Sequence, residues 1–145
     1  MLTTNDLMTI DPDIVSPETS LREVVALMNK RNSRQLPVVR DGKLIGIITD
    51  RDVRLAVNSP LLTNDPAERI ALLDHFTAEN CMTRHPKTVT PDTPIHKVAQ
   101  ILSAYKYGAL PVVEDDQLMG IITVTDLLNQ MALVPEAEPI MLEPV

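Results

Sequence analysis

The stretch "LPVVRDGKLIGIITDRD" occupies residues 36–52, and "LPVVEDDQLMGIITVTD" occupies residues 110–126. Each begins with a short apolar run, passes through a polar turn and continues into a second apolar run that ends in threonine. Asp-Gly between two apolar runs is a β-hairpin signal, and near-continuous apolar runs are typical of strands buried on both faces. The recurrence of this hairpin 74 positions later predicts a fold built from two copies of one unit.

The duplication extends beyond the hairpin. A shift of 74 positions aligns residues 2–57 with residues 76–131 without a gap, and 19 of the 56 aligned positions are identical. An amphipathic segment precedes the hairpin; in the first copy Leu21, Val24 and Met28 share one face at helical spacing. A second such segment follows it. Each copy therefore predicts an extended lead, a helix, two strands and another helix, and the two copies predict a pseudo-two-fold pair.

This pattern divides the chain into four parts. Residues 1–57 form the first repeat and residues 76–133 form the second. Residues 58–75 form a linker in which the segment 66–74 is a predicted short helix. Residues 134–145 are acidic and rich in proline, which cannot continue a helix, so we expect a flexible tail there.

Composition excludes several classes of function. The chain of 145 residues has a net charge of −7 and a pI of about 4.8, which argues against nucleic acid as a partner because phosphates require a basic face. An anionic membrane surface is disfavoured for the same reason. No apolar run approaches the roughly 20 residues of a membrane-spanning helix, and the N-terminus has no signal-peptide pattern. With one cysteine and therefore no internal disulfide, we expect a cytoplasmic protein.

The pair Thr49 and Asp52, repeated as Thr123 and Asp126, has two explanations that do not exclude each other. The spacing [ST]-x-x-[DE] at a helix start is a capping box. A helix N-terminus also suits a phosphate group, and an aspartate beside it can accept hydrogen bonds from a ribose diol. The glycine three residues before each threonine indicates that backbone or a ligand comes close to the strand. These junctions are therefore candidate nucleotide sites.

These motifs together resemble the CBS domain, named after cystathionine β-synthase, and the tandem resembles a CBS pair, or Bateman module. The resemblance covers residues 2–57 and 76–131. It implies an α/β (α+β) fold of two pseudo-symmetric repeats, each a small three-stranded sheet with two flanking helices. It also implies a homodimer and clefts between the repeats that bind AMP, ADP or ATP, with or without magnesium. S-adenosylmethionine and NAD are the alternative ligands.

The resemblance further implies that the lead of each repeat lines the cleft of the other repeat. The residues it assigns to the first cleft, favoured for nucleotide, are Arg34, Gln35, Thr49, Arg51, Asp52, Thr83, Lys87, Thr88 and Val89. Those it assigns to the second, weaker cleft are Thr9, Asp13, Ile14, Val15, Gly108, Ala109, Thr123, Thr125 and Asp126.

The two assigned sets differ in charge. Arg34, Arg51 and Lys87 bring three cations to the first cleft, whereas the equivalent positions of the second hold glycine, threonine and aspartate. A charge-assisted hydrogen bond contributes roughly 1.5–3 kcal/mol when it is desolvated. We therefore expect the first cleft to bind a phosphorylated adenosine ligand. We expect the second to bind weakly, to bind an uncharged adenosine, or to stay empty.

Other chemistry finds little support. The three histidines have no metal-ligand spacing, and Cys81 aligns with Leu7, which favours a packed thiol over a nucleophile. No base, nucleophile and substrate site occur together, so we predict a regulatory module that senses its ligand and signals to a partner, not an enzyme. The alternative is a ligand-independent scaffold in which threonine and aspartate act only as helix caps.

Overall fold

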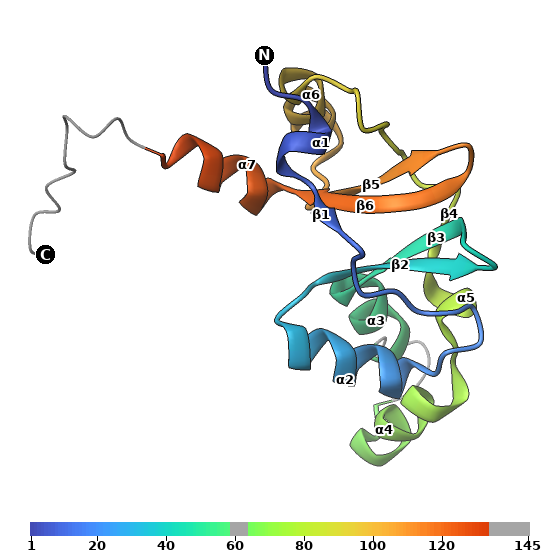
Figure 1. Cartoon of the computed structure of the whole chain (residues 1–145). Helices are drawn as coiled ribbons and strands as arrows, with labels where there is room; N and C mark the ends of the chain where they lie inside the picture. The colour runs from blue at the N-terminus through green and yellow to red at the C-terminus, as the bar shows by residue number, and fades with distance from the viewer. Residues whose placement is uncertain (59–63, 134–145) are drawn as a thin grey trace, which may run out of the picture.

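The computed structural model describes residues 1–58 and 64–133, and the predicted tail at 134–145 lies outside the described residues. Apart from α4, which lies in the linker, every element of the first copy has a counterpart in the second. Figure 1 shows two stacked halves, one around the hairpin of each copy. The elements are α1 (Thr4–Leu7), β1 (Thr9–Ile10), α2 (Leu21–Arg31), β2 (Gln35–Arg40), β3 (Lys43–Thr49), α3 (Asp50–Val57), α4 (Pro66–His75), α5 (Ala78–Cys81), β4 (Thr83–Arg84), α6 (Ile95–Tyr105), β5 (Ala109–Glu114), β6 (Gln117–Thr123) and α7 (Val124–Met131).

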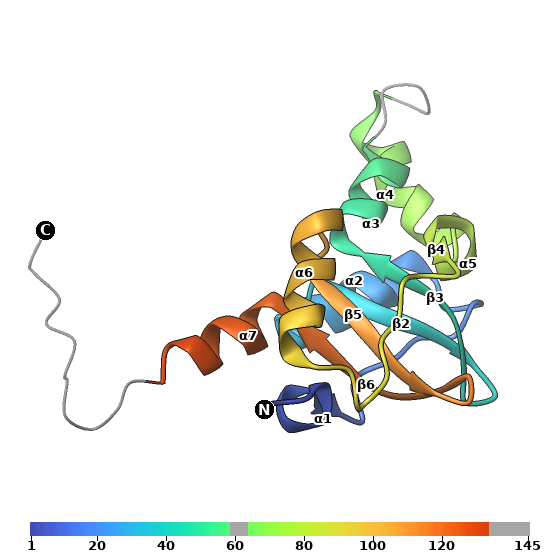
Figure 2. The ribbon, with the colours of Figure 1, turned by 90° about the horizontal axis from the view of Figure 1, so that it is seen from above.

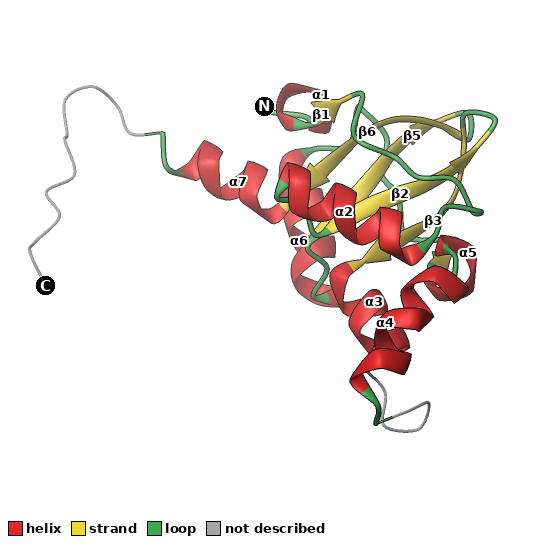
Figure 3. Cartoon of the chain, turned by 90° about the horizontal axis from the view of Figure 1, so that it is seen from below, coloured by secondary structure: helices red, strands yellow, loops and turns green. Residues whose placement is uncertain are grey.

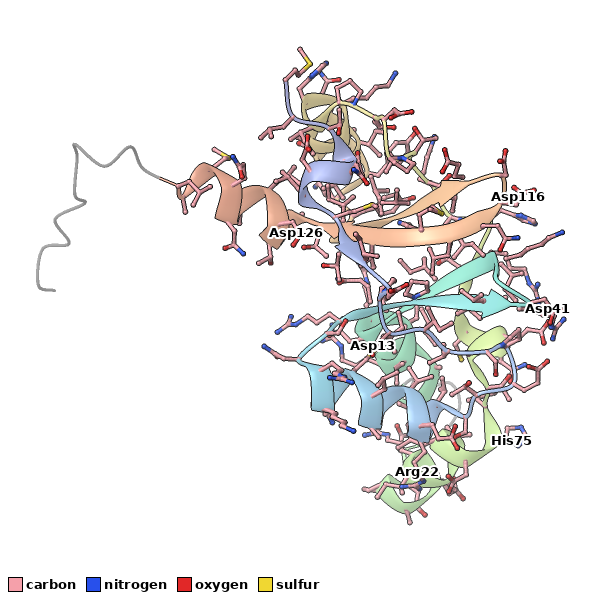
Figure 4. The ribbon with its side chains drawn as sticks, in the orientation of Figure 1. Asp13, Arg22, Asp41, His75, Asp116 and Asp126 are labelled. Atoms are coloured by element: carbon pink, nitrogen blue, oxygen red, sulfur yellow. The ribbon has the colours of Figure 1, made fainter. Side chains whose placement is uncertain are left out.

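Two antiparallel hairpins, β2–β3 and β5–β6, form the centre of the fold. Leu36 pairs with Ile48 in the first hairpin, and the equivalent residues pair in the same register in the second. The hairpins meet near their turns, which Asp41 and Asp116 mark in Figure 4, and together the strands make a six-stranded antiparallel sheet. The predicted class, mixed helix and sheet in two pseudo-symmetric repeats, is confirmed.

The third strand of each half comes from the other repeat. Strand β4, in the lead of the second repeat, pairs with β3, so that Thr83 faces Ile47. Strand β1, in the lead of the first repeat, pairs with β6, so that Thr9 faces Ile121. Figure 2 shows β4 beside β3 in the view from above. The two leads are thus exchanged, and neither hairpin has three strands from its own repeat.

A glycine within each inner strand permits this exchange. A methyl group at Gly46 would lie 2.9 Å from the carbonyl oxygen of Thr83, and one at Gly120 would collide with the carbonyl oxygen of Thr9. Any side chain here would hold the lead strand away from the hairpin. Of the two explanations that the sequence left open for these glycines, close approach of backbone is the one observed.

The core consists of two aliphatic clusters, one in each half. Leu21 and Ile48 are fully buried in the first, and Ile122 is fully buried in the second. The exchanged leads contribute to both: Cys81 and Met82 pack against the first cluster, and Leu7 and Met8 pack against the second. Burial of apolar side chains is the main favourable term in folding. Each half therefore depends on the other repeat for part of its core as well as for a strand.

Helix α4 breaks the symmetry of the two halves. It lies against α2 and α3 (Figure 3), where Arg22 Nε donates to Asp74 Oδ1 at 2.6 Å. The end of α3 is covered on this side, and Val57 is only 8 % exposed. Its counterpart on α7, Met131, is 78 % exposed, because α7 extends away from the second half (Figure 1). The linker between the repeats thus completes the first half alone.

Gly120→Ala tests the exchange of leads. We expect it to lower the free energy of unfolding by about 1–3 kcal/mol, because the added methyl group displaces backbone and not a side-chain tip. Gly108→Ala is the matched control, since there the methyl group would meet the flexible end of Gln35. Urea unfolding followed by circular dichroism measures both variants. Equal stability of Gly120→Ala and the unmodified chain would contradict the proposed role of the glycine.

Candidate ligand-binding cleft

Both predicted capping boxes are present. Thr49 Oγ1 accepts a hydrogen bond from the Asp52 N–H at 3.1 Å, and Asp52 Oδ2 accepts one from the Thr49 N–H at 2.9 Å. The Thr123–Asp126 box has the same two bonds at 3.0 and 2.8 Å. Neither box uses Oδ1 of its aspartate. The second carboxylate oxygen can therefore accept a hydrogen bond from a ligand hydroxyl without loss of the cap.

A cavity of ≈ 490 Å³ opens beside the first box, and we call it the first cleft. Its volume lies in the range of small-molecule sites. Its wall combines the start of α3 in the first repeat with the lead and the α6–β5 connection of the second. Six of the nine residues predicted for this cleft line it: Gln35, Thr49, Arg51, Asp52, Thr83 and Lys87.

The other three residues predicted here, Arg34, Thr88 and Val89, are not among the described residues that line the cavity. Val89 is 5 % exposed and belongs to the core of the second half. Arg34 lines a separate groove with Asp50 of α3. The part of Arg34 in nucleotide binding therefore stays a prediction.

Gly108 and Ala109, predicted for the second cleft, line the first cleft instead. The reason is that the segments preceding the two hairpins meet at the pseudo-two-fold axis, where a methyl group on Gly108 would lie 2.5 Å from Gln35 Nε2. The segment before each hairpin can therefore reach the cleft beside the other hairpin. The same crossing brings in Tyr105, Lys106 and Tyr107, which the sequence analysis missed.

A signal for these three residues was present in the sequence. The phrase "YKYG" at 105–108 holds both tyrosines of a chain that has no tryptophan and one phenylalanine. In the structure the two tyrosine rings stack, with centroids 5.4 Å apart and an interplanar angle of 12°. The resemblance implies that the lead of each repeat crosses to the cleft of the other repeat. The same crossing, assumed for residues 105–108, would have predicted them in the first cleft.

The first cleft holds three cations, although not the three that were predicted. Arg51 and Lys87 are joined by Lys106 in place of Arg34. The Nζ atom of Lys87 lies over the Tyr105 ring, 4.7 Å from its centroid. The Tyr105 side chain, chiefly as a hydrogen-bond partner, raises the pKa of Lys87. Lys87 therefore carries its full charge at neutral pH, in the lining of the same cavity as Asp52.

The residues predicted for the second cleft include the Thr123–Asp126 box, and the others lie in β1 and the segment after it, at or just before the start of β5, and on α7. Figure 4 shows Asp126 at the start of α7 and Asp13 on the lead that runs toward β2. Asp13 Oδ2 lies 3.4 Å from Arg31 Nε, so its charge is partly balanced. The remaining assigned residues differ in exposure: Thr9, Ile14 and Thr125 are exposed, and Val15 is buried in the core of the first half.

Cys81 is half-buried against the first core cluster, as a packed thiol. Burial, and after it the negative charge of Asp52, raises the pKa of this thiol. Within residues 1–58 and 64–133, no group of three or more His, Cys, Asp or Glu side chains could hold a metal ion. No helix in the same ranges is long and apolar enough to cross a membrane.

Comparison with known proteins agrees with this architecture. The model of the CBS domain matches residues 5–59 and 78–133, so the chain belongs to the CBS domain family, as a tandem pair. A CBS domain-containing protein of Dictyostelium discoideum is 34% identical over 127 residues, which are 86% of this chain and 88% of that protein.

Two solved structures resemble the fold closely. CBSX2 of Arabidopsis thaliana in complex with AMP has a TM-score of 0.75 and 28% identity, over 90% of this chain and 96% of that one. The CBS domain pair of protein MJ0100 in complex with 5-methylthioadenosine and S-adenosyl-L-methionine has a TM-score of 0.71 and 30% identity, over the same shares.

Thr49→Ala tests the capping role alone. In the absence of any ligand, we expect it to lower the free energy of unfolding by about 1 kcal/mol, since one helix N–H loses its acceptor. Thr123→Ala should cost a similar amount. Thr125→Ala is the control in the same urea titration, because Thr125 is exposed and lies two residues after Thr123, outside the capping box. An unchanged midpoint for Thr49→Ala would contradict the structural role of the box.

Proposed function

We propose that this CBS pair is a regulatory module that binds an adenine nucleotide in the first cleft and passes the binding signal to a partner protein. The observation that carries the proposal is that Arg51, Lys87 and Lys106 line one cavity together with the carboxylates of Asp50 and Asp52. The AMP complex of CBSX2 and the 5-methylthioadenosine and S-adenosyl-L-methionine complexes of MJ0100 support an adenosine-containing ligand.

Each part of the cleft suits one part of a nucleotide. Oδ1 of Asp52 accepts from the ribose hydroxyls, while Oδ2 remains in the capping box. The three cations receive the phosphate, because charge-assisted bonds to phosphate are the strongest available. The Asp50 and Asp52 N–H groups at the start of α3 already donate to Arg34 O and Thr49 Oγ1. Ile47, Ala109 and Pro111 provide apolar wall for the base.

A ligand in this cleft links the two repeats. It contacts β3 and α3 of the first repeat together with the lead and α6 of the second, so its binding energy depends on their relative position. A ligand shifts a conformational equilibrium by its differential affinity for the states. The module therefore transmits ligand occupancy as a change in the arrangement of the repeats. The proposal also includes a homodimer that works in the cytoplasm.

The alternative is a ligand-independent scaffold. The complete capping boxes favour it to the extent that they account for threonine and aspartate without a ligand. It gives no reason for a cavity whose lining holds one more cation than the two carboxylates of Asp50 and Asp52 balance. Thermal stability with and without nucleotides separates the two functions.

A thermal-shift panel with AMP, ADP, ATP, NAD, 5-methylthioadenosine and S-adenosylmethionine tests the proposal. A ligand at 100 times its dissociation constant adds about 2.7 kcal/mol of stability, which raises the melting temperature by several degrees for a domain of this size. We expect AMP, ADP or ATP to give this shift. Asp52→Ala should abolish it and Asp126→Ala should retain it. No shift with any compound would favour the scaffold.

Arg51→Ala tests the contribution of the cations. We expect it to weaken AMP binding by about tenfold, because one charge-assisted bond to phosphate is lost. Arg54→Ala is the matched control: Arg54 is on the same helix, exposed, and does not line the first cleft. Calorimetry in which Arg51→Ala binds AMP more tightly than Asp126→Ala would contradict the proposed order of the two clefts.

A further inference from the structure

The positions of Lys87 and Tyr105 have equivalents in the other repeat, which hold different residues. A shift of 74 positions places Lys87 on Asp13 and Tyr105 on Arg31. Both pairs are in contact: Lys87 Nζ lies 4.7 Å from the centre of the Tyr105 ring, and Arg31 Nε lies 3.4 Å from Asp13 Oδ2. The fold therefore brings these two positions together in both repeats, whatever the residues that occupy them.

The two pairs differ in the charge that they leave available. A tyrosine ring attracts an ammonium ion through its quadrupole and carries no net charge, so Lys87 keeps its full positive charge. A carboxylate partner offsets part of the charge of Arg31 and itself repels an anion. The equivalent positions thus present a cation in one repeat and an ion pair in the other.

The pair Lys87 and Tyr105 lies where a difference in charge can affect ligand binding. Lys87 and Tyr105 both line the first cleft, as Arg51 of α3 does. Tyr105 also stacks on Tyr107, which lines the same cleft and restricts how the ring can turn. An exposed lysine side chain that samples many rotamers is thereby held over a fixed ring.

We propose that Tyr105 is a positioning residue that holds the Lys87 ammonium group at the first cleft, and that this pair selects ligands carrying a phosphate over the unphosphorylated nucleoside. The inference rests on the proposed binding of an adenine nucleotide in this cleft. It adds that two contacting residues, Lys87 and Tyr105, set the preference for a phosphorylated ligand. The other repeat has an ion pair at the equivalent positions.

The other repeat supplies the test variant. The double substitution Lys87→Asp with Tyr105→Arg copies the pair at 13 and 31, which this backbone already accommodates. We expect calorimetry to show AMP affinity lowered by about tenfold or more, with adenosine affinity changed less than about twofold and the urea midpoint retained. Equal losses for AMP and adenosine would overturn the proposal.

Single substitutions test the positioning role. Tyr105→Leu removes both the ring face and the hydroxyl and should lower the ratio of AMP to adenosine affinity about two- to fivefold. Tyr105→Phe keeps the ring face and removes only the hydroxyl, so it should lower that ratio by less. In a Lys87→Ala background, Tyr105→Leu should lower the ratio no further, because the residue acts through Lys87. A loss of the same size in that background would overturn the positioning role.

Binding of AMP and adenosine by the unmodified chain separates failure of the proposed function from failure of the inference about Lys87 and Tyr105. If the chain binds neither AMP nor adenosine, the proposed function fails, and the selection by charge fails with it. If it binds both and the Tyr105 and Lys87 variants leave their ratio unchanged, the proposed function stands and the inference about the pair is wrong.

Discussion

The exchange of the two leads is the constraint on which the rest of the structure depends. Each lead completes the sheet and part of the core of the opposite half, and it can do so only because glycine stands at 46 and 120. Neither repeat has a complete sheet by itself, so the two fold as one unit. A cleft whose walls come from both repeats is a necessary consequence of this topology, with or without a ligand.

Within this shared frame the two halves are free to differ where side chains are exposed. Positions 51 and 125, or 87 and 13, lie at helix starts and in leads, where substitution changes charge without changing the core. Core positions such as Ile48 and Ile122 have remained the same residue, because cores tolerate volume changes poorly. The two repeats therefore share their core residues and differ in charge at these exposed positions, as the proposed difference between the two clefts requires.

The local part of this structure could be predicted from the sequence, and the crossing of segments could not. The strand at 43–49 and both capping boxes follow from patterns of a few residues. Which cavity Arg34 and Gly108 line could not be predicted in this way, because both follow a helix and precede a strand, and only tertiary packing decides which cleft such a segment reaches. The burial of Val89 in the core of the second half is likewise decided by packing and not by a local pattern.

Asp52 shows why a helix cap and a ligand site are not competing explanations. The cap needs one carboxylate oxygen and fixes the rotamer of the side chain, so the other oxygen is held ready for a ligand before one arrives. Such preorganisation reduces the entropy lost on binding. Asp126 has the same cap and the same free oxygen, yet Thr125, beside it, lacks the charge of Arg51. The cap is therefore common to both junctions, and under the proposed function the cations beside it determine which of them holds a phosphate.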